Sequence, residues 1–277
     1  MAQIRVMVSG AGGRMGRTVV AAVMDAGDMV VVGGVDPAYP ETPLSELVSG
    51  APGAQIATTV EEGIAKFDPE VMVDFTQPSA LMHNIPTALH ESVACVVGTT
   101  GFTQHLLDEM CELCEQCGTP AVIAPNFSIG ANLMMKFAAE AAPLMDYAAI
   151  MEAHHENKLD APSGTAMATA ERMRETRGED FEFQQTEHFG LGGVRGGEHG
   201  GVSIHSIRMS GVVANQTVIL GGPGETLRIE HVTTGRECFM PGVLLAIREV
   251  RDLDGLVCGL EELLVSTYPR GRPPRVH

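Results

Sequence analysis

The fold of this chain is decided by residues 4–36, which read IRVMVSGAGGRMGRTVVAAVMDAGDMVVVGGVD. The first five residues alternate as in a short buried strand, and a glycine-rich turn follows at residues 10–16. Apolar residues then recur at helical spacing up to Gly27, which can end a helix. Residues 29–35 form a second, β-branched run that ends at Asp36. This order of strand, glycine turn, helix, strand and acid is typical of a dinucleotide-binding unit.

The glycine turn has the residue types that a pyrophosphate needs. Glycines stand at positions 10, 13 and 16, whereas the strict G-x-G-x-x-G pattern would place its last glycine where Met15 stands. Glycines let a backbone approach a pyrophosphate closely, and a helix N-terminus offers free N–H groups. Asp36 lies where a carboxylate would accept the hydroxyls of an adenosine ribose. The alternative is a glycine-rich turn that binds no nucleotide, and the strand context and the terminal acid argue against it.

Repeated strand and helix patterns continue to residue 124. Strands are expected at residues 70–76, 93–97 and 121–124. Helices are expected at residues 79–90 and, capped by Thr103, through residue 117. Such βα units predict a parallel sheet whose ligand loops lie at the carboxyl ends of the strands. Gly98-Thr99-Thr100 and Ala124-Pro125-Asn126-Phe127 are two of these loops.

The pattern changes in the second half of the chain. A helix is expected at residues 132–145, and strand-like stretches follow at 148–152, 203–209, 216–220 and 226–232. Glycine turns separate these strands, which indicates an open, mixed or antiparallel sheet. Two helices are expected at residues 242–250 and 256–264, and a loose tail at 270–277. The expected fold class is α/β, with a Rossmann-like parallel-sheet domain and a smaller α+β domain with an open mixed sheet. The expected domains are 1–125, completed by 240–277, and 126–239.

Composition limits the partners. The chain has 277 residues and a formal net charge of −17. Such a surface repels phosphate backbones and anionic lipids, so we expect neither nucleic acid nor membrane partners. No apolar run is long enough to span a bilayer, and the first residues lack a signal-peptide pattern, so a cytoplasmic location is expected. A small anionic substrate must then be held by a local cluster of cations.

The stretch EAHHENKLDAPSGTA, residues 152–166, carries the most informative chemistry. Two histidines, a lysine and an aspartate follow a predicted strand, and a helix is expected to open at residues 162–165, where Ser163 or Thr165 can cap it. A dicarboxylate could meet Lys158, imidazoles and the free N–H groups of a helix N-terminus there. A crowded lysine can also deliver a proton. A plain polar loop is the alternative, and a zinc site is disfavoured because adjacent histidines point to different sides.

Two further features allow two interpretations each. Cys111, Cys114 and Cys117 could suggest an iron–sulfur cluster, but they lie within a predicted helix, where cysteine packs as a small hydrophobe. We therefore expect no metal. The glycine-rich residues 190–201 are expected to form either a flexible linker or a loop that closes on substrate. Arg208 is a candidate for a second contact to a substrate carboxylate.

Several motifs together resemble the 4-hydroxy-tetrahydrodipicolinate reductases, also called dihydrodipicolinate reductases. They are Gly10–Gly16, Asp74-Phe75-Thr76, Gly98-Thr99-Thr100-Gly101-Phe102, Pro125-Asn126-Phe127-Ser128 and His154-His155-x-x-Lys158-x-Asp160-Ala161-Pro162-Ser163-Gly164-Thr165. The resemblance covers nearly the whole chain and keeps the order of the motifs. The last motif is specific, whereas the glycine turn is not.

The resemblance implies an enzyme of lysine and diaminopimelate synthesis that passes a hydride from NADH or NADPH to C4 of a cyclic unsaturated dicarboxylate, with loss of water. It implies that His154 donates or accepts a proton, and that Lys158 protonates C3. It implies that the substrate carboxylates are bound by His155, Gly164 and Thr165. It implies that the cofactor is lined by Gly10, Ala11, Gly12, Gly13, Arg14, Met15, Asp36, Gly98, Thr99, Thr100, Ala124, Pro125, Asn126 and Phe127.

The resemblance also implies a homotetramer, which fits a second sheet with uncovered edges and one uncovered face. The chain departs from the family pattern after Arg208, where Met209-Ser210-Gly211 precedes Ala214-Asn215-Gln216. Pro37 follows Asp36 where some members have arginine, so we expect NADH to be preferred over NADPH, with Arg14 limiting the preference. The rival hypothesis is a regulator that senses NADH and performs no chemistry.

Overall fold

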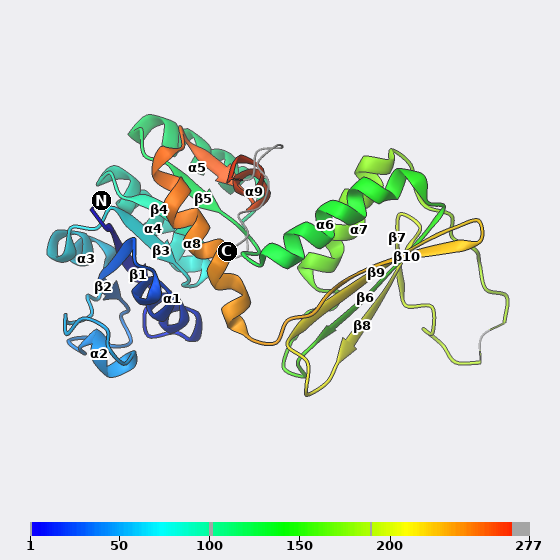
Figure 1. Ribbon diagram of the computed structural model, residues 1–277, viewed down its shortest axis with the longest axis horizontal. Helices are drawn as coiled ribbons and strands as arrows, with labels where there is room; N and C mark the ends of the chain where they lie inside the picture. Colours follow the sequence, from blue (N-terminus) through cyan, green and yellow to red (C-terminus); the bar gives the residue numbers. More distant parts are fainter. Residues whose placement is uncertain (1, 100–101, 189, 268–277) are drawn as a thin grey trace, which may run out of the picture. The chain divides into compact units, whose positions relative to one another are not determined.

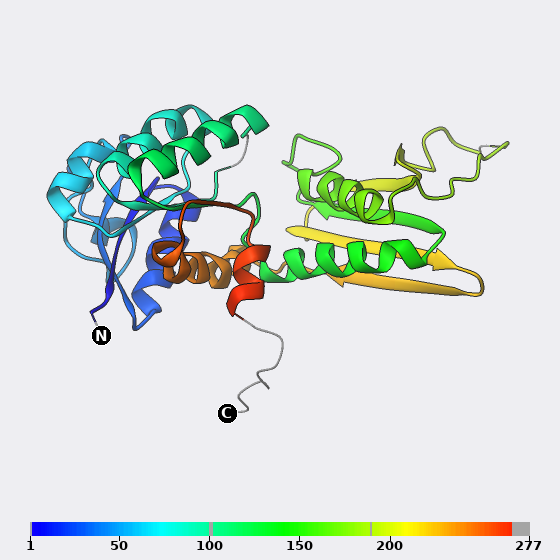
Figure 2. The ribbon, with the colours of Figure 1, turned by 90° about the horizontal axis from the view of Figure 1, so that it is seen from above.

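The computed structural model describes residues 2–99, 102–188 and 190–267, and the chain divides into two compact units (Figures 1 and 2). The first unit runs to Ser128 and resumes at Phe239, and the second comprises Ile129–Cys238.

The first unit is built on a six-stranded sheet in the order β11-β5-β4-β3-β1-β2, and every neighbouring pair is parallel. Its strands are β1 (Ile4–Ser9), β2 (Met29–Val35), β3 (Val71–Asp74), β4 (Ala94–Val97), β5 (Ala121–Ile123) and β11 (Leu256–Cys258). All residues of β3, β4 and β5 are buried, as in sheets that helices cover on both faces.

Helices cover both faces of this sheet. They are α1 (Arg14–Asp25), α2 (Leu44–Leu47), α3 (Val60–Phe67), α4 (Pro78–His90), α5 (Gln104–Cys117), α8 (Met240–Glu249) and α9 (Glu261–Thr267). Helix α4 packs between α3 and α5, whereas α1 packs on α8. Thr103 caps α5 as predicted, because its side chain accepts a hydrogen bond from Leu106 N.

The strand order places a ligand edge at the carboxyl ends of the strands. Ser9 pairs with Val35 on one side and with Asp74 on the other, and Asp74 pairs with Val97. These last residues of β1, β2, β3 and β4 therefore end at one level. The chain order reverses between β1 and β3, and such a switch point is where open parallel sheets bind ligands.

The second unit has a five-stranded sheet in the order β10-β9-β6-β8-β7, in which only the pair β6 and β8 is parallel among the described residues. Its strands are β6 (Tyr147–His154), β7 (Gly197–His199), β8 (Val202–Arg208), β9 (Ala214–Gly222) and β10 (Glu225–His231). The helices α6 (Ile129–Ala141) and α7 (Gly164–Arg177) pack on each other and on one face of the sheet. The predicted fold class, a Rossmann-like sheet with a second mixed sheet, is confirmed.

The two faces of the second sheet differ. Ala148 and Ile150 of β6 are buried in the core shared with α6 and α7. Residues at alternate positions point to the opposite face. On that face Tyr147 and Met151 are 44% and 42% exposed, and Ile207 of β8 is 38% exposed. An apolar face is therefore left open within this unit.

Two predicted helices have different bounds in the structure. The prediction of one helix over residues 256–264 is wrong, because Leu256–Cys258 forms β11 on the free edge of β5 and α9 begins only at Glu261. Helix α6 begins at Ile129 and ends at Ala141, and a 3₁₀ turn (Ala142–Leu144) follows it. Pro143 lies in this turn, and proline disfavours the continuation of an α-helix.

The glycine-rich segment 190–201 is not a linker throughout. Gly197–His199 forms β7, which pairs with β8. Gly201 has φ +80°, and a Cβ there would lie 2.0 Å from the carbonyl oxygen of Phe181. The segment therefore contains glycines that close packing requires. The expected tail at 270–277 lies outside the described residues, and none of the described helices is long and apolar enough to cross a membrane.

The cysteines of α5 pack as expected from their helical spacing. Cys114 is fully buried in the core beneath β4 and β5, whereas Cys111 and Cys117 are partly exposed. Burial raises the pKa of the Cys114 thiol to about 11, so it is a poor thiolate ligand.

We predict that Cys114→Ser leaves the protein colourless and active but lowers its free energy of unfolding by about 1–3 kcal/mol, because a hydroxyl is buried in an apolar site. Urea denaturation measures this loss. The exposed Cys258 provides the control, since Cys258→Ser should change stability by less than about 0.5 kcal/mol. Stoichiometric iron in anaerobically purified protein would contradict the packing assignment.

Candidate active site

The glycine turn between β1 and α1 is closely packed. Gly10 has φ +78°, and a Cβ at Gly16 would lie 2.0 Å from the carbonyl oxygen of Gly10. A Cβ at Gly12 would lie 2.9 Å from Oδ2 of Asp36. Side chains at these positions would therefore force the turn apart, and their absence leaves a cradle of bare backbone of the kind that a pyrophosphate fits.

The backbone of the turn leaves the start of α1 open. Gly10 N and Ala11 N donate to Val35 O, Gly12 N donates to Asp36 Oδ2 and Gly13 N donates to Gly10 O. Gly13 is the N-cap of α1, and no side chain of the described residues caps this helix. The first-turn N–H groups, including those of Arg14 and Met15, therefore remain for an anion.

Asp36 lies directly beside the turn. Its Oδ2 accepts from Gly12 N at 3.0 Å and its Oδ1 accepts from Ala38 N at 3.0 Å. A carboxylate has further lone pairs, so Asp36 can still accept ribose hydroxyls. A cation on the same turn of the chain is Arg17, whose Nε donates to Gly12 O at 2.8 Å and whose NH2 donates to the Tyr39 hydroxyl at 3.2 Å. The sequence analysis missed Arg17, although it stands one position after the last glycine of the turn.

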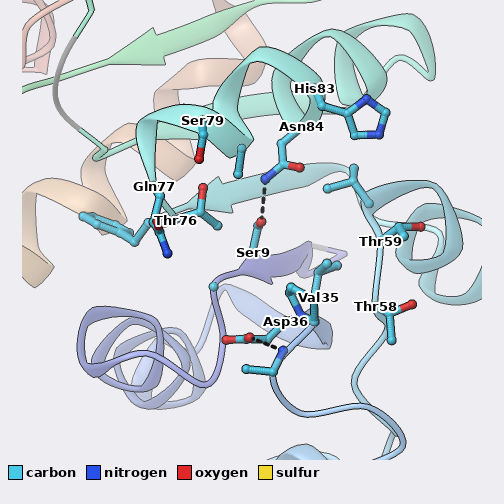
Figure 3. A pocket seen from close by; sticks show the side chains of 16 residues that line it. Ser9, Val35, Asp36, Thr58, Thr59, Thr76, Gln77, Ser79, His83 and Asn84 are labelled. Carbon is cyan, nitrogen blue, oxygen red and sulfur yellow. Dashed lines mark hydrogen bonds between the residues drawn. The ribbon is translucent and has the colours of Figure 1, made fainter.

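A cavity of about 450 Å³ opens between the ends of β1, β2 and β3 and the start of α4 (Figure 3). Asp36, Thr76, Gln77, His83 and Asn84 are among its lining residues. The sequence analysis did not assign the last three of these. Gln77 had a signal, because it directly follows the Asp74-Phe75-Thr76 loop at the carboxyl end of a buried strand, whereas His83 and Asn84 lie inside α4.

The carboxylate of Asp74, at the end of β3, connects the segments that form this edge of the sheet. The side chain is fully buried, and its Oδ1 accepts from Thr76 N at 3.0 Å and from the Thr76 hydroxyl at 2.7 Å. Thr99 Oγ1 donates to the same oxygen at 3.3 Å, and Asn84 Nδ2 donates to Oδ2 at 2.9 Å. The loops after β3 and β4 and helix α4 are thus tied to one carboxylate.

The loops after β4 and β5 complete the edge. A Cβ at Gly98 would lie 2.0 Å from the ring of Phe75, and the ring of Phe127 lies 6.0 Å from that of Phe75. Thr99, Ala124 and Phe127 are buried, Pro125 is exposed, and Asn126 Oδ1 accepts from Ser128 N. Thr100 lies outside the described residues. The other residues expected to line a cofactor therefore come together at one edge of the first unit.

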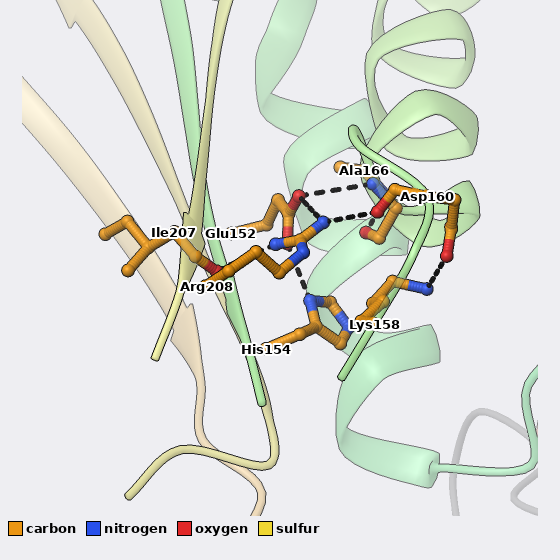
Figure 4. A network of polar contacts seen from close by, with 8 residues as sticks. Glu152, His154, Lys158, Asp160, Ala166, Ile207 and Arg208 are labelled. Atoms are coloured by element: carbon orange, nitrogen blue, oxygen red, sulfur yellow. Dashed lines mark hydrogen bonds and ion pairs between the residues drawn. The ribbon is translucent and has the colours of Figure 1, made fainter. Parts of the chain in front are cut away.

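The second cluster lies where β6 ends in the second unit (Figure 4). Glu152 and His154 are two positions apart on β6, so their side chains share a face. Nδ1 of His154 lies 2.6 Å from Oε2 of Glu152. Burial lowers the pKa of His154, against the opposing effect of Glu152. His154 is therefore held by a carboxylate and favours its neutral form.

Lys158 stands on the turn that follows β6, beside the His154 ring in Figure 4. Its Nζ donates to Asp160 Oδ1 at 2.8 Å, and this hydrogen bond lowers the pKa of Asp160. His155 is exposed on the same turn, and its carbonyl accepts from Lys158 N. The turn therefore presents an ammonium group and an imidazole to the solvent side.

Helix α7 begins next to this turn. Ser163 is its N-cap and accepts from Ala166 N at 3.2 Å, as one of the two capping predictions stated. The N–H groups of Gly164 and Thr165 belong to the first turn, which has no intrahelical acceptors. A Cβ at Gly164 would meet no described atom within 4 Å. The predicted residues His154, Lys158, Gly164 and Thr165 thus lie at one end of β6 and α7.

Arg208 contacts a carboxylate of the protein itself. Its NH1 and NH2 donate to the two oxygens of Glu152, each at 2.9 Å, and a contact of Arg208 with a substrate carboxylate stays a prediction. Its NH2 also donates to the backbone oxygen of Asp160 at 2.7 Å. The parallel pairing of β6 and β8 brings Arg208 opposite His154, and this register was not evident from spacing along the chain.

Two family models cover most of the chain. The sequence matches the family described as "Dihydrodipicolinate reductase, N-terminus" over residues 4–127 and "Dihydrodipicolinate reductase, C-terminus" over residues 130–264. It is 46% identical to a 4-hydroxy-tetrahydrodipicolinate reductase of Moorella thermoacetica, over 95% of this chain and 99% of the relative. It is 44% identical to the protein of that name from Desulfitobacterium hafniense, over 95% of this chain and 100% of the relative.

Solved structures agree as well. A dipicolinate-bound dihydrodipicolinate reductase from Paenisporosarcina sp. TG-14 superposes with a TM-score of 0.83 at 36% identity, covering 94% of this chain and 99% of the other. An amine dehydrogenase from Mycobacterium smegmatis, 13% identical with a TM-score of 0.67 over 99% of this chain and 98% of the other, shares the fold alone. The chain belongs to the dihydrodipicolinate reductase family and is an NAD(P)H-dependent oxidoreductase.

Proposed function

We propose that this protein reduces 4-hydroxy-tetrahydrodipicolinate to tetrahydrodipicolinate, with loss of water, in the synthesis of diaminopimelate and lysine. The observation that carries the proposal is the cluster at the end of β6, where Lys158, His154 and the N-terminus of α7 lie together. An ammonium group, an imidazole and free N–H groups suit a small dicarboxylate. The relatives that carry the reductase name support the same substrate.

The second unit would hold the substrate and handle protons. The N–H groups of Gly164 and Thr165 would bind one carboxylate, and exposed His155 would contact a carboxylate from the neighbouring turn. Lys158 carries protons on Nζ, so it can protonate C3, whereas neutral His154 can exchange a proton through its ring. A regulator without chemistry would have no use for a buried carboxylate behind that imidazole, which argues against the rival hypothesis.

The first unit would hold NADH or NADPH, which supplies the hydride that C4 of the substrate receives. The open N-terminus of α1 and the bare turn of Gly10, Gly12 and Gly13 would take the pyrophosphate. The cavity of about 450 Å³ beside Asp36 would take the adenosine end. The loops at Gly98, Thr99 and Thr100 and at Ala124–Phe127 would line the rest of the cofactor.

Self-association as a homotetramer is part of the proposal. The open face of the second sheet carries Tyr147, Met151 and Ile207, and exposed apolar faces of this kind are usually covered by another copy. β10 and β7 also leave the two edges of this sheet unpaired among the described residues.

The roles of His154 and Lys158 are tested by steady-state kinetics. We predict that His154→Gln and Lys158→Ala each lower kcat by roughly 10²–10⁴-fold, the range for lost proton transfer, with little change in cofactor affinity. The exposed Lys66 of α3 provides a matched control, because Lys66→Ala removes the same charge from the other unit. Turnover of Lys158→Ala at the wild-type rate would refute the role of this lysine.

Cofactor choice depends on Asp36. The 2′-phosphate of NADPH carries about −1.5 to −2 charges, which a neighbouring carboxylate repels, and Pro37 offers no cation. We predict a preference for NADH of roughly tenfold in kcat/KM, equivalent to about 1.4 kcal/mol. The preference is partial because Arg14 and Arg17 lie at the start of α1, next to the glycine turn.

Asp36→Ser should reduce the preference for NADH over NADPH. The substitution weakens the binding of the NADH ribose hydroxyls and removes the repulsion of the 2′-phosphate of NADPH. The matched control is Asp25→Ser, which removes the same charge at the exposed end of α1. Equal or better use of NADPH by the unchanged protein would show that the arginines outweigh Asp36.

Light scattering at micromolar concentration tests the assembly. We predict a mass about four times the 29.3 kDa of one chain, because the open sheet face needs a partner surface. A mass near 29.3 kDa would contradict the tetramer.

A further inference from the structure

Glu152 is a buried carboxylate on β6 of the second unit. Its side chain is fully buried, and it accepts hydrogen bonds from His154, from both terminal nitrogens of Arg208 and from the backbone N–H of Ser163. Ser206, its neighbour on β8, is a further donor. Burial raises the pKa of Glu152, but these hydrogen bonds outweigh burial and hold it below the usual range. Glu152 is therefore an anion that only accepts.

An acceptor at Nδ1 determines which nitrogen of His154 carries the proton. A neutral imidazole has one N–H, and only a proton on Nδ1 makes the 2.6 Å contact with Glu152 a hydrogen bond. Among the described residues, no hydrogen bond reaches the other nitrogen, Nε2. Nε2 is then the atom with a free lone pair.

We infer that Glu152 is a positioning residue that holds His154 in its Nδ1–H form, so that Nε2 faces the substrate as a proton acceptor. This inference rests on the proposed function, and it divides the two proton tasks. His154 accepts a proton from C3 of the substrate as the 4-hydroxyl leaves, and passes it to that hydroxyl, which is lost as water. Lys158 Nζ supplies the proton that C3 receives after the hydride has reached C4.

Arg208 makes this arrangement possible. The other charged groups that act on His154 are Lys158 and Arg208, and both disfavour its protonated form. Through its bidentate contact Arg208 keeps Glu152 ionised, and through Asp160 O it also holds the turn that carries Lys158. The negative charge next to Ser163 N is thereby balanced, which leaves the start of α7 attractive to a substrate carboxylate.

The protonation state can be observed without turnover. In protein labelled with ¹⁵N-histidine, His154 is assigned by its absence from the spectrum of His154→Gln. We expect its Nδ1 to carry hydrogen and its Nε2 to be unprotonated between pH 7 and 8, on the order of one unit above the ordinary histidine pKa. A His154 signal with hydrogen on Nε2 alone would overturn the inference, even if the enzyme is active.

Glu152→Gln tests the consequence for turnover. A glutamine amide can donate to Nδ1, which would move the proton to Nε2. We expect kcat to fall roughly 10- to 100-fold, as for other residues that orient a functional histidine, with KM for NADH within about twofold and a shifted pH profile of kcat. Wild-type kcat and pH profile in this variant would also overturn the inference.

The protein contains its own matched control. The carboxylate of Glu171 lies 2.7 Å from His199 Nε2 and forms an ion pair with Arg174. This group has the same residue types as Glu152, His154 and Arg208 but lies outside the proposed site. Glu171→Gln should leave kcat and the pH profile unchanged. If Glu152→Gln does not fold, the ¹⁵N-histidine spectrum of the wild-type protein still shows which nitrogen of His154 carries hydrogen, and so tests the inference. If wild-type protein fails to reduce the dicarboxylate at all, the proposed function fails, whereas the spectrum reports on Glu152 alone.

Discussion

The ion pair between buried Glu152 and Arg208 is the interaction on which the second unit's site depends. A carboxylate with no exposed surface must be matched by donors, and breaking such a pair by removing one partner costs about 3–5 kcal/mol. The pair connects β6, which carries Glu152, to β8, which carries Arg208. Arg208 also donates to the Asp160 carbonyl, and the backbone N–H of Ser163 at the start of α7 donates to Glu152. These contacts hold the imidazole, the turn that carries Lys158 and the N-terminus of α7 in fixed positions relative to one another, as the proposed proton transfer would require.

Each unit has a helix N-terminus at its proposed site, and the two N-termini are arranged differently. In a chain with net charge −17, the positive potential that the proposed anionic ligands need must come from local groups. In the first unit, α1 starts at Arg14 and its N-cap Gly13 provides no side-chain cap, so the N–H groups of its first turn remain available. In the second unit, Ser163 caps α7 and Arg208 balances the nearby Glu152, while Gly164 leaves the space in front of the helix open. Helix ends thus provide the positive potential that the composition lacks.

The sequence was most informative where structure depends on neighbouring residues. The unit from Ile4 to Asp36 was predictable because strand alternation, glycine turn and helical spacing are local patterns. So was the start of α7, because its Pro162-Ser163-Gly164-Thr165 signal is local too. β11 was mistaken for helix, because three residues have no clear period and their state is set by the edge of β5. Edge pairing of this kind is a property of the whole sheet.

The contacts within the site were less predictable. Arg208 and Glu152 are 56 positions apart, and only the parallel register of β8 beside β6 brings them together. The Asp74 network and Arg17 were overlooked for a similar reason, since their significance lies in which loops they join. The stretch from Glu152 to Thr165 contains the proposed site residues of the second unit and Glu152 itself, whereas Arg208, which holds Glu152, comes from another strand.

A crystal structure of the protein with NADH and pyridine-2,6-dicarboxylate would test the account most directly. The account predicts one ligand carboxylate at about 2.7–3.2 Å from the N–H groups of Gly164 and Thr165. Lys158 Nζ and His154 Nε2 would point at the ligand, while Glu152 remained on Nδ1. A dicarboxylate bound elsewhere, or a His154 ring turned so that Nε2 faced Glu152, would contradict it.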